Sequence, residues 1–202
     1  TGGDLRSSRI YELCFTRSGV GIASGGGVFG NLTLLSRDAG ATWHDITATV
    51  QGGIACSGDM GLWAVGDGIR HSTDGGRTWV DLTDRLPATV DPSEIGVPPS
   101  FVDARTGWLV AQLRSGARAV LQTTDEGETW SELAELSFTS ETRLGSRLDF
   151  ATSRFGIANG QRTDDTGSRF AAAALTRAGG ATGKATAFAD DVLMVRDLAL
   201  VP

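Results

Sequence analysis

The sequence predicts an all-β fold made of four repeated units. Three observations predict it: an eight-residue turn motif recurs along the chain, a pair of short apolar strands precedes each copy, and helical periodicity is nearly absent. The 28 glycines among the 202 residues suit a protein with many turns. A chain of this length can bury a full core in one domain, so we expect a single domain over residues 1–202.

The turn motif has the pattern S-x-D-x-G-x-T-W. It occurs twice in full, and a third copy begins with threonine in place of serine. A fourth copy keeps Thr176, Gly180 and Thr182 but has lost the aspartate and the tryptophan. The motif residues of the three clear copies are Ser36, Asp38, Gly40, Thr42 and Trp43; Ser72, Asp74, Gly76, Thr78 and Trp79; and Thr123, Asp125, Gly127, Thr129 and Trp130.

The chemistry of the motif predicts a hairpin turn. Serine, threonine and aspartate side chains accept hydrogen bonds from nearby backbone amides, and glycine adopts a positive φ at low cost. Threonine and tryptophan then begin a new strand, because β-branched and aromatic residues fit a half-buried pleated surface. We therefore expect Asp38, Asp74 and Asp125 to accept backbone hydrogen bonds within their own hairpins.

The strand pairs recur in step with the motif, and each pair is joined at a glycine. These glycines, Gly19, Gly61, Gly107 and Gly156, lie 42, 46 and 49 residues apart. The positions five residues before them hold small apolar residues: Cys14, Cys56, Val102 and Ala151. The spacing suits units of four short strands. The units are expected at about 8–50, 51–95, 96–143 and 144–190.

Each unit is expected to contain four antiparallel strands in chain order. In the second unit the middle strands are predicted at 62–65 and 69–72, the motif turn follows, and the fourth strand begins at Trp79. The alanine run 171–174 takes the place of the third strand in the last unit. Repeated four-stranded antiparallel sheets predict a β-propeller, whose sheets are blades arranged around a channel.

The motif resembles the Asp-box, or BNR, repeat of sialidases, sortilin-type receptors, xyloglucanases and the photosystem II assembly and stability factors. The stretch GLWAVGDGIRHSTDGGRTW, residues 61–79, is most similar to the last of these. The resemblance covers nearly the whole chain. It implies the propeller fold strongly and function weakly, since Asp boxes occur on the outer part of blades in proteins of unrelated activity. It also implies an extracytoplasmic location, which includes the periplasm, a lumen, the exterior and the periphery of a membrane.

Tryptophans and cysteines are the residues expected between the blades. The tryptophans expected to be largely buried there are Trp43, Trp79 and Trp130, with Trp63 and Trp108 packed on second strands. Cys14 and Cys56 occupy equivalent positions in adjacent repeats, on neighbouring inner strands. A disulfide requires Cα atoms within ~7 Å, and inner strands of different blades usually stand farther apart. The favoured interpretation is therefore two small buried apolar residues rather than a disulfide.

Charge and composition exclude several classes of partner. A formal charge of −6 and a pI near 4.9 argue against nucleic acid, which needs a basic footprint. No apolar run reaches the ~18 residues of a membrane-spanning helix, so we expect no transmembrane segment. The chain opens without an initiator methionine or a signal peptide, as expected of a processed or truncated product.

No metal, cofactor or catalytic site is predicted. Two histidines, His44 and His71, have no further ligand at metal-binding spacing, and the stretch GGATGKAT lacks the spacing of a phosphate-binding loop. A sialidase is rejected, because the only tyrosine is Tyr11 and the Phe-Arg-Ile-Pro segment is absent.

A glycosidase that uses two carboxylates stays open, because the separation of the two groups is a property of the fold. Asp59, Asp67 and Asp103 are the candidates, since they lie in loops that could face the channel. Their favoured interpretation is solvated turn residues, because aspartate is a preferred turn former.

Two features are candidates for binding another protein. The longest connection between repeats, 83–100, holds four of the five prolines, and it is either a contact surface or a spacer. The second candidate is a local basic patch formed by arginines that concentrate in the third and fourth repeats, although dispersed, solvated arginines are the favoured interpretation. The candidate partner-binding residues are Pro87, Pro92, Pro98, Pro99, Arg105, Arg114 and Arg118.

The sequence thus predicts a non-enzymatic scaffold that binds protein partners, as an assembly factor or accessory subunit of a larger extracytoplasmic or membrane-bound complex. The alternative is a carbohydrate-active enzyme, namely a glycoside hydrolase or a fragment of one. After the fourth unit, two apolar runs at 192–195 and 198–201 resemble the opening strands of a fifth. We expect 192–201 to pair with the strand around 10–15, sealing the ring, or with a segment of another chain.

Overall fold

A computed structural model describes residues 9–27, 30–66, 68–95, 97–133, 142–163, 169–177 and 184–187. In this part of the chain the strands form four antiparallel sheets of four strands each, in chain order from one side of each sheet to the other. The first two sheets contain β1 (Arg9–Phe15), β2 (Gly21–Gly27), β3 (Gly30–Ser36), β4 (His44–Asp45), β5 (Gly53–Ser57), β6 (Gly61–Gly66), β7 (Gly68–Ser72) and β8 (Val80–Asp81). The last two contain β9 (Ser100–Phe101), β10 (Gly107–Gln112), β11 (Arg118–Thr123), β12 (Ser131–Glu132), β13 (Thr142–Phe150), β14 (Gly156–Thr163), β15 (Arg169–Thr176) and β16 (Lys184–Ala187).

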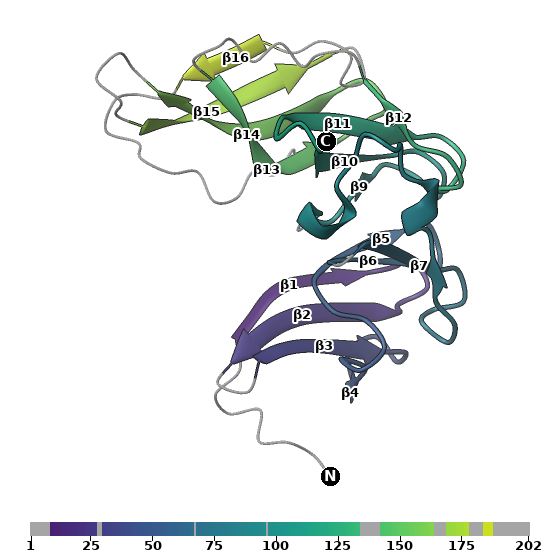
Figure 1. Cartoon of the computed structure of the whole chain (residues 1–202). Coiled ribbons are helices and arrows are strands. Elements are labelled where there is room, and N and C mark those ends of the chain that lie inside the picture. Colours follow the sequence, from purple (N-terminus) through teal and green to yellow (C-terminus); the bar gives the residue numbers. More distant parts are fainter. Residues whose placement is uncertain are drawn as a thin grey trace.

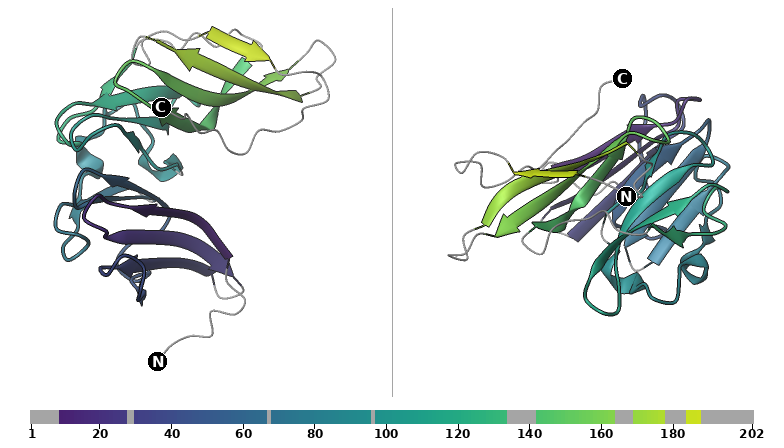
Figure 2. Two further views of the ribbon diagram at one scale, coloured as in Figure 1. Left: turned by 180° about the vertical axis from the view of Figure 1, so that it is seen from behind. Right: turned by 90° about the horizontal axis from the view of Figure 1, so that it is seen from above.

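The four sheets are the blades of a β-propeller, and the predicted all-β fold class is confirmed. The first strands of neighbouring blades lie together, β1 beside β5, β5 beside β9, and β9 beside β13. Figures 1 and 2 show the blades following one another along an arc, with blade one and blade four at its two ends. We call the interface between adjacent blades a seam. The leading face of a blade is turned towards the preceding blade, and its trailing face towards the next.

The strand register shows that two of the glycines chosen as repeat markers, Gly19 and Gly61, are not at the equivalent position of their blades. In blades three and four, the first motif residue pairs with the expected glycine, Thr123 with Gly107 and Thr176 with Gly156. In blade one the residue opposite Ser36 is Gly21 instead of Gly19, and in blade two Ser72 stands opposite Leu62 instead of Gly61. Both segments contain several glycines, so glycine alone does not mark the register.

One contact recurs at the two seams that join blade three to its neighbours. Phe101 and Phe150 each end the first strand of a blade, and each ring lies over the paired glycine so closely that a Cβ would not fit there. Phe101 stacks on Trp63 of blade two with ring centroids 4.7 Å apart, and Phe150 stacks on Trp108 of blade three at 3.8 Å. The leading face therefore presents a phenylalanine, and the preceding blade's trailing face presents the tryptophan that receives it.

Cys14 and Cys56 form a disulfide with Cα atoms 5.9 Å apart, so the expected pair of free cysteines is wrong. The register explains the error. Cys56 holds the strand position that Phe101 holds in blade three, and it points back towards blade one. Cys14 lies one residue before that position, since Phe15 pairs with Gly21, and it points forward to blade two. Equivalent positions would both point the same way around the arc, whereas a one-residue offset turns the two thiols towards each other.

The tryptophans follow the expected pattern in part. Trp63 and Trp108 are fully buried and Trp130 is nearly so, packed edge-on against Trp63 in the seam between blades two and three. Trp43 and Trp79 are only half-buried, which differs from the expectation. Trp43 packs against Phe15 on the leading face of blade one, at the end of the arc.

The predicted C-terminal pairing segment 192–201 lies outside the described residues, as do Asp67 and positions 178–183 of the fourth motif copy. In the described part of the chain, no helix has the length and apolar character needed to cross a membrane.

Candidate functional site

The antiparallel order gives each blade two different edges. The turns between the first and second strands and between the third and fourth strands share one edge, which we call the turn edge. The turns between second and third strands share the opposite edge with the segments that link blades, and we call this the connector edge. The S-x-D-x-G-x-T-W motifs lie on the turn edge.

Each clear copy of the motif closes its hairpin through its own side chains. In the second copy, Asp74 accepts hydrogen bonds from the Thr78 amide at 2.9 Å and the Thr78 hydroxyl at 2.8 Å, and the Ser72 hydroxyl accepts one from Gly76 N at 2.8 Å. These bonds from Thr78 hold the pKa of Asp74 well below its usual range. The first and third copies repeat the pattern through Asp38 and Asp125, so the predicted backbone hydrogen bonds are confirmed.

The motif also joins the two turns of its own blade. As expected, the motif glycine has a positive φ in all three clear copies. The residue before it also has a positive φ, and this residue is Ala39 in the first copy, Gly75 in the second and Glu126 in the third. The amide of that residue donates to the first turn of the same blade, for example Glu126 N to Arg105 O at 3.0 Å. The sequence interpretation missed this second left-handed position, because only one of the three copies has glycine there.

Contacts along the turn edge continue from blade to blade. The Arg37 guanidinium, in the first motif, donates to the carbonyls of Gly75 and Gly76 in the second, at 3.2 and 3.0 Å. Arg17 forms an exposed ion pair with Asp59 at 3.4 Å. The turn edges of blades one and two are thus joined by structural contacts.

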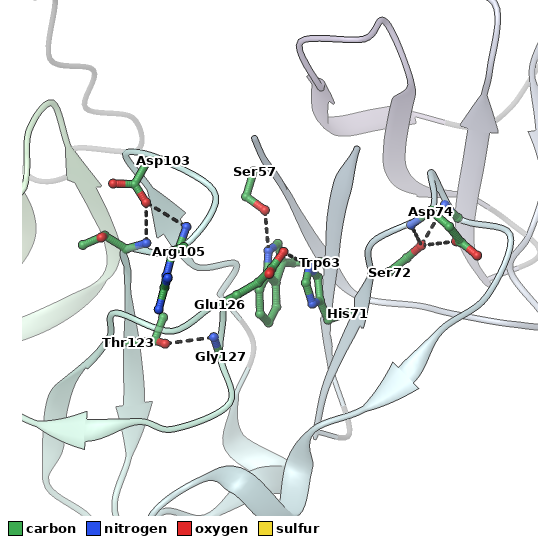
Figure 3. A network of polar contacts seen from close by, with 12 residues as sticks. Ser57, Trp63, His71, Ser72, Asp74, Asp103, Arg105, Thr123, Glu126 and Gly127 are labelled. Carbon is green, nitrogen blue, oxygen red and sulfur yellow. Dashed lines mark hydrogen bonds and ion pairs between the residues drawn. The ribbon is translucent and has the colours of Figure 1, made fainter. Parts of the chain in front are cut away.

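A cluster of side chains with polar atoms lies on this edge between blades two and three, around the buried His71 (Figure 3). The indole Nε1 of Trp63 donates to the Ser57 hydroxyl at 3.0 Å, and its ring stacks on His71 with centroids 3.8 Å apart. His71 is 5% exposed, its Nε2 makes no hydrogen bond, and Glu126 Oε1 lies 4.0 Å from it across the seam. Burial lowers the pKa of His71 from 6.5 to about 4, so the ring is neutral at neutral pH.

His71 and His44 do not come together. His44 is exposed on β4 of blade one, whereas His71 is buried in blade two. Within the ranges that the structure describes, no cluster of histidine, cysteine and acidic residues has the arrangement of a metal site.

The candidate catalytic carboxylates Asp59 and Asp103 both lie in first turns on the turn edge. Asp103 accepts hydrogen bonds from the amides of Arg105 and Thr106 at 2.7 and 2.6 Å (Figure 3). Partial burial raises the pKa of Asp103, but these hydrogen bonds outweigh it and the net direction is downward. A lowered pKa is poorly suited to the general acid that glycoside hydrolysis requires.

On the opposite edge, the connector 83–100 contains the 3-10 helices η2 (Thr83–Arg85) and η3 (Pro92–Glu94). Its residues Val90 and Ile95 are fully buried and pack with Trp63 and Leu109 between blades two and three. The connector therefore fills the seam as well as linking the blades, which a polar, exposed loop would not do.

The exposed part of the connector is tied to the turn between β10 and β11. Asp91 N donates to Gln112 O at 2.9 Å, and Arg114 N donates to Thr89 O at 2.8 Å. The Arg114 guanidinium reaches Ala88 O at 3.1 Å, and Val90 forms a β-bridge with Leu113. We call residues 86–92 together with 113–118 the connector surface.

The structure separates the predicted partner-binding residues into two groups. Pro87, Pro92, Arg114 and Arg118 lie on the connector surface, with Arg114 and Arg118 exposed. Arg105 lies at the other end of β10, on the turn edge, where its Nε donates to Thr124 O at 3.4 Å. The arginines therefore do not form one patch.

The remaining two prolines lie where the chain enters blade three. Pro99 is buried, and Pro98 packs against Gly53 of β5. Both are placed for packing between first strands, away from the connector surface.

Comparison with solved structures shows the propeller fold. The chain is similar to the GH74 xyloglucanase from Xanthomonas campestris, with 10% sequence identity and a TM-score of 0.51 over 90% of this chain and 38% of that chain. It is also similar to a protein of unknown function from Dyadobacter fermentans, with 16% identity and a TM-score of 0.48 over 88% of this chain and 72% of that chain. The chain thus spans well under half of the length of the xyloglucanase. No family model and no curated protein matches the chain.

Proposed function

We propose that this propeller is a non-enzymatic scaffold that binds another protein through its connector surface. The observation that carries the proposal is the rigid attachment of an exposed loop. The amides of Asp91 and Arg114 and the Arg114 side chain hold 88–91 against blade three, while Val90 anchors it in the seam. A loop that is already ordered loses little conformational entropy on binding, which favours recognition.

The role in a larger extracytoplasmic or membrane-bound complex, as an assembly factor or accessory subunit, is part of the same proposal. The Cys14–Cys56 disulfide supports it, because such bonds form and persist in oxidising compartments. The hydrogen bonding around Asp38, Asp74 and Asp125 supports assignment of the motif to the Asp-box repeat, and with it the resemblance to the photosystem II assembly and stability factors.

Capture of a partner followed by variant binding tests the proposal. The immobilised chain is incubated with membrane and soluble extracts of the source cells, captured proteins are identified by mass spectrometry, and the affinity of the purified partner is then measured. We expect Arg118→Glu to weaken binding at least tenfold, which corresponds to about 1.4 kcal/mol. The matched control is Arg105→Glu, because that arginine is also exposed but lies on the turn edge.

If Arg118→Glu and Arg105→Glu bind the partner equally well, the connector surface is not the binding site. The rival function is tested separately by incubating the chain with xyloglucan and related polysaccharides. Release of reducing sugar that Asp103→Asn abolishes contradicts the scaffold and establishes a glycoside hydrolase.

A further inference from the structure

Blade one presents the same leading face as blades three and four. Phe15 ends β1, pairs with Gly21, and its ring covers that glycine as the rings of Phe101 and Phe150 cover theirs. In those two blades the ring is received by a tryptophan of the preceding blade. Phe15 has no such partner among the described residues, and it is 44% exposed.

The exposed apolar surface continues along β1. Leu13 alternates with Glu12 and Cys14, which point towards blade two, so it shares the leading face with Phe15. Leu13 is 56% exposed. Apolar side chains that stand together on one strand face usually mark a surface that another protein segment covers.

Blade four presents the complementary trailing face. Ile157 follows Gly156 as Trp108 follows Gly107, so it occupies the position that receives a phenylalanine in the two aromatic seams. Its cross-strand neighbour Leu175 points to the same side and is 41% exposed. This chain therefore carries both halves of one further seam.

The two halves lie at opposite ends of the arc in Figures 1 and 2, so one described chain does not bring them together. We propose that a second copy of the chain supplies the missing neighbour at each end. Phe15 of one protomer packs on the partner's Ile157 and the partner's Leu175, and the reverse contact forms at the other end.

Two arcs joined in this way form a ring of eight blades, which is within the range of about four to eight blades that propellers adopt. Head-to-tail contacts of this kind give a closed ring when the rotation between copies closes. The contact uses the positions of the two internal aromatic seams, with the aliphatic pair of Ile157 and Leu175 in place of the tryptophan.

The molar mass in solution tests the proposal. By light scattering after size exclusion, we expect the full chain to have twice the 21.1 kDa of one copy. Phe15→Asp and Leu175→Glu, each by itself, are expected to reduce the mass to that of one copy. Val80→Asp is the matched control, because Val80 is 58% exposed on the outer strand of blade two, away from both ends, and the mass should not change.

Mixing the two single variants identifies the faces in contact. A mixture of Phe15→Asp and Leu175→Glu retains one intact seam, with Phe15 from one variant and Leu175 from the other, so part of the population should return to the mass of two copies. If Phe15→Asp does not fold, as judged by circular dichroism, Leu13→Asp replaces it in both measurements.

A wild-type chain with the mass of one copy overturns the proposal, as does an oligomer that Leu175→Glu leaves intact. The second result would mean that two β1 faces pack on each other. Neither result bears on the connector surface, whose partner binding is measured independently with Arg118→Glu.

Discussion

The seam between blades one and two and the seam between blades two and three use the same backbone repeat with different contents. The first seam is aliphatic, formed by residues such as Ile22, Leu35 and Leu62, and the Cys14–Cys56 disulfide crosses it. The second seam is aromatic, with Trp63 enclosed by His71, Phe101 and Trp130, and the buried connector residues complete it.

The difference depends on a single pair of positions. Ile22 in blade one corresponds to Trp63 in blade two, and Cys56 corresponds to Phe101. A small pair lets the first strands approach closely enough for a disulfide, whereas a stacked aromatic pair fills the seam with apolar area. The first seam therefore combines aliphatic packing with a covalent bond, and the second depends on aromatic packing alone.

The largest expected effect is at the aromatic seam. Trp63→Ala should lower the free energy of unfolding by about 3–5 kcal/mol, because it removes a fully buried ring that contacts three other aromatic side chains. Trp79→Ala, at a half-buried motif tryptophan of the aliphatic seam, should cost clearly less. Urea unfolding measures both, and equal losses would remove the distinction between the seams.

The next effect is at the covalent seam. Replacing Cys14 and Cys56 together with serine should lower the free energy of unfolding by about 2–4 kcal/mol, because the bond closes a long loop with a sequence separation of 42. Adding a reducing agent should destabilise the wild-type protein to a similar extent and leave the double variant unchanged. A wild-type protein whose unfolding midpoint does not respond to reductant would show that packing alone holds this seam.

The third effect is the pH dependence of the aromatic seam. His71 in the unfolded chain binds its proton near pH 6.5, whereas burial lowers the native pKa to about 4. Between these values the unfolded state binds more protons, so the His71 contribution is complete above pH 6.5 and is lost as the pH falls towards 4. His71→Phe keeps an aromatic ring against Trp63 and removes the titration.

The measurement is the unfolding free energy of both proteins between pH 4 and 6.5, the interval set by the two pKa values. We expect the wild-type protein to lose stability across this interval and His71→Phe to lose less. Parallel profiles would mean that other groups cause the loss.

The smallest expected effect is at the turn edge. Asp74→Ala removes the acceptor of the Thr78 bonds and should lower the melting temperature by a few degrees, because the turn donors are then satisfied only by water. Asp74→Asn keeps an acceptor oxygen and should lower it less. Partner binding through the connector surface should be unchanged in both. A variant that kept its melting temperature and lost only binding would make Asp74 a recognition residue.

The amino-acid sequence by itself determined the local elements of this protein. The motif turns, their aspartate hydrogen bonds and the division into four-stranded sheets depend on residues within a few positions of each other, such as Ser72, Asp74 and Thr78. These interactions form in the same way in the three clear copies, so repetition identifies them. The buried position of Trp63 and Trp108 was also predicted, because large aromatic residues on second strands pack in any such sheet.

Only the tertiary structure decided what lies across the seams. Three contacts join residues from different blades. They are the disulfide between Cys14 and Cys56, the packing of Val90 of the connector against Trp63 and Leu109, and the approach of Glu126 to His71. Which side chain meets which depends on strand register, and a shift of one residue turns a side chain to the other face of its sheet. Register is set by which face of each strand is buried and by the geometry of the turns, so the contacts across a seam depend on packing between blades that the order of residues along one strand does not specify.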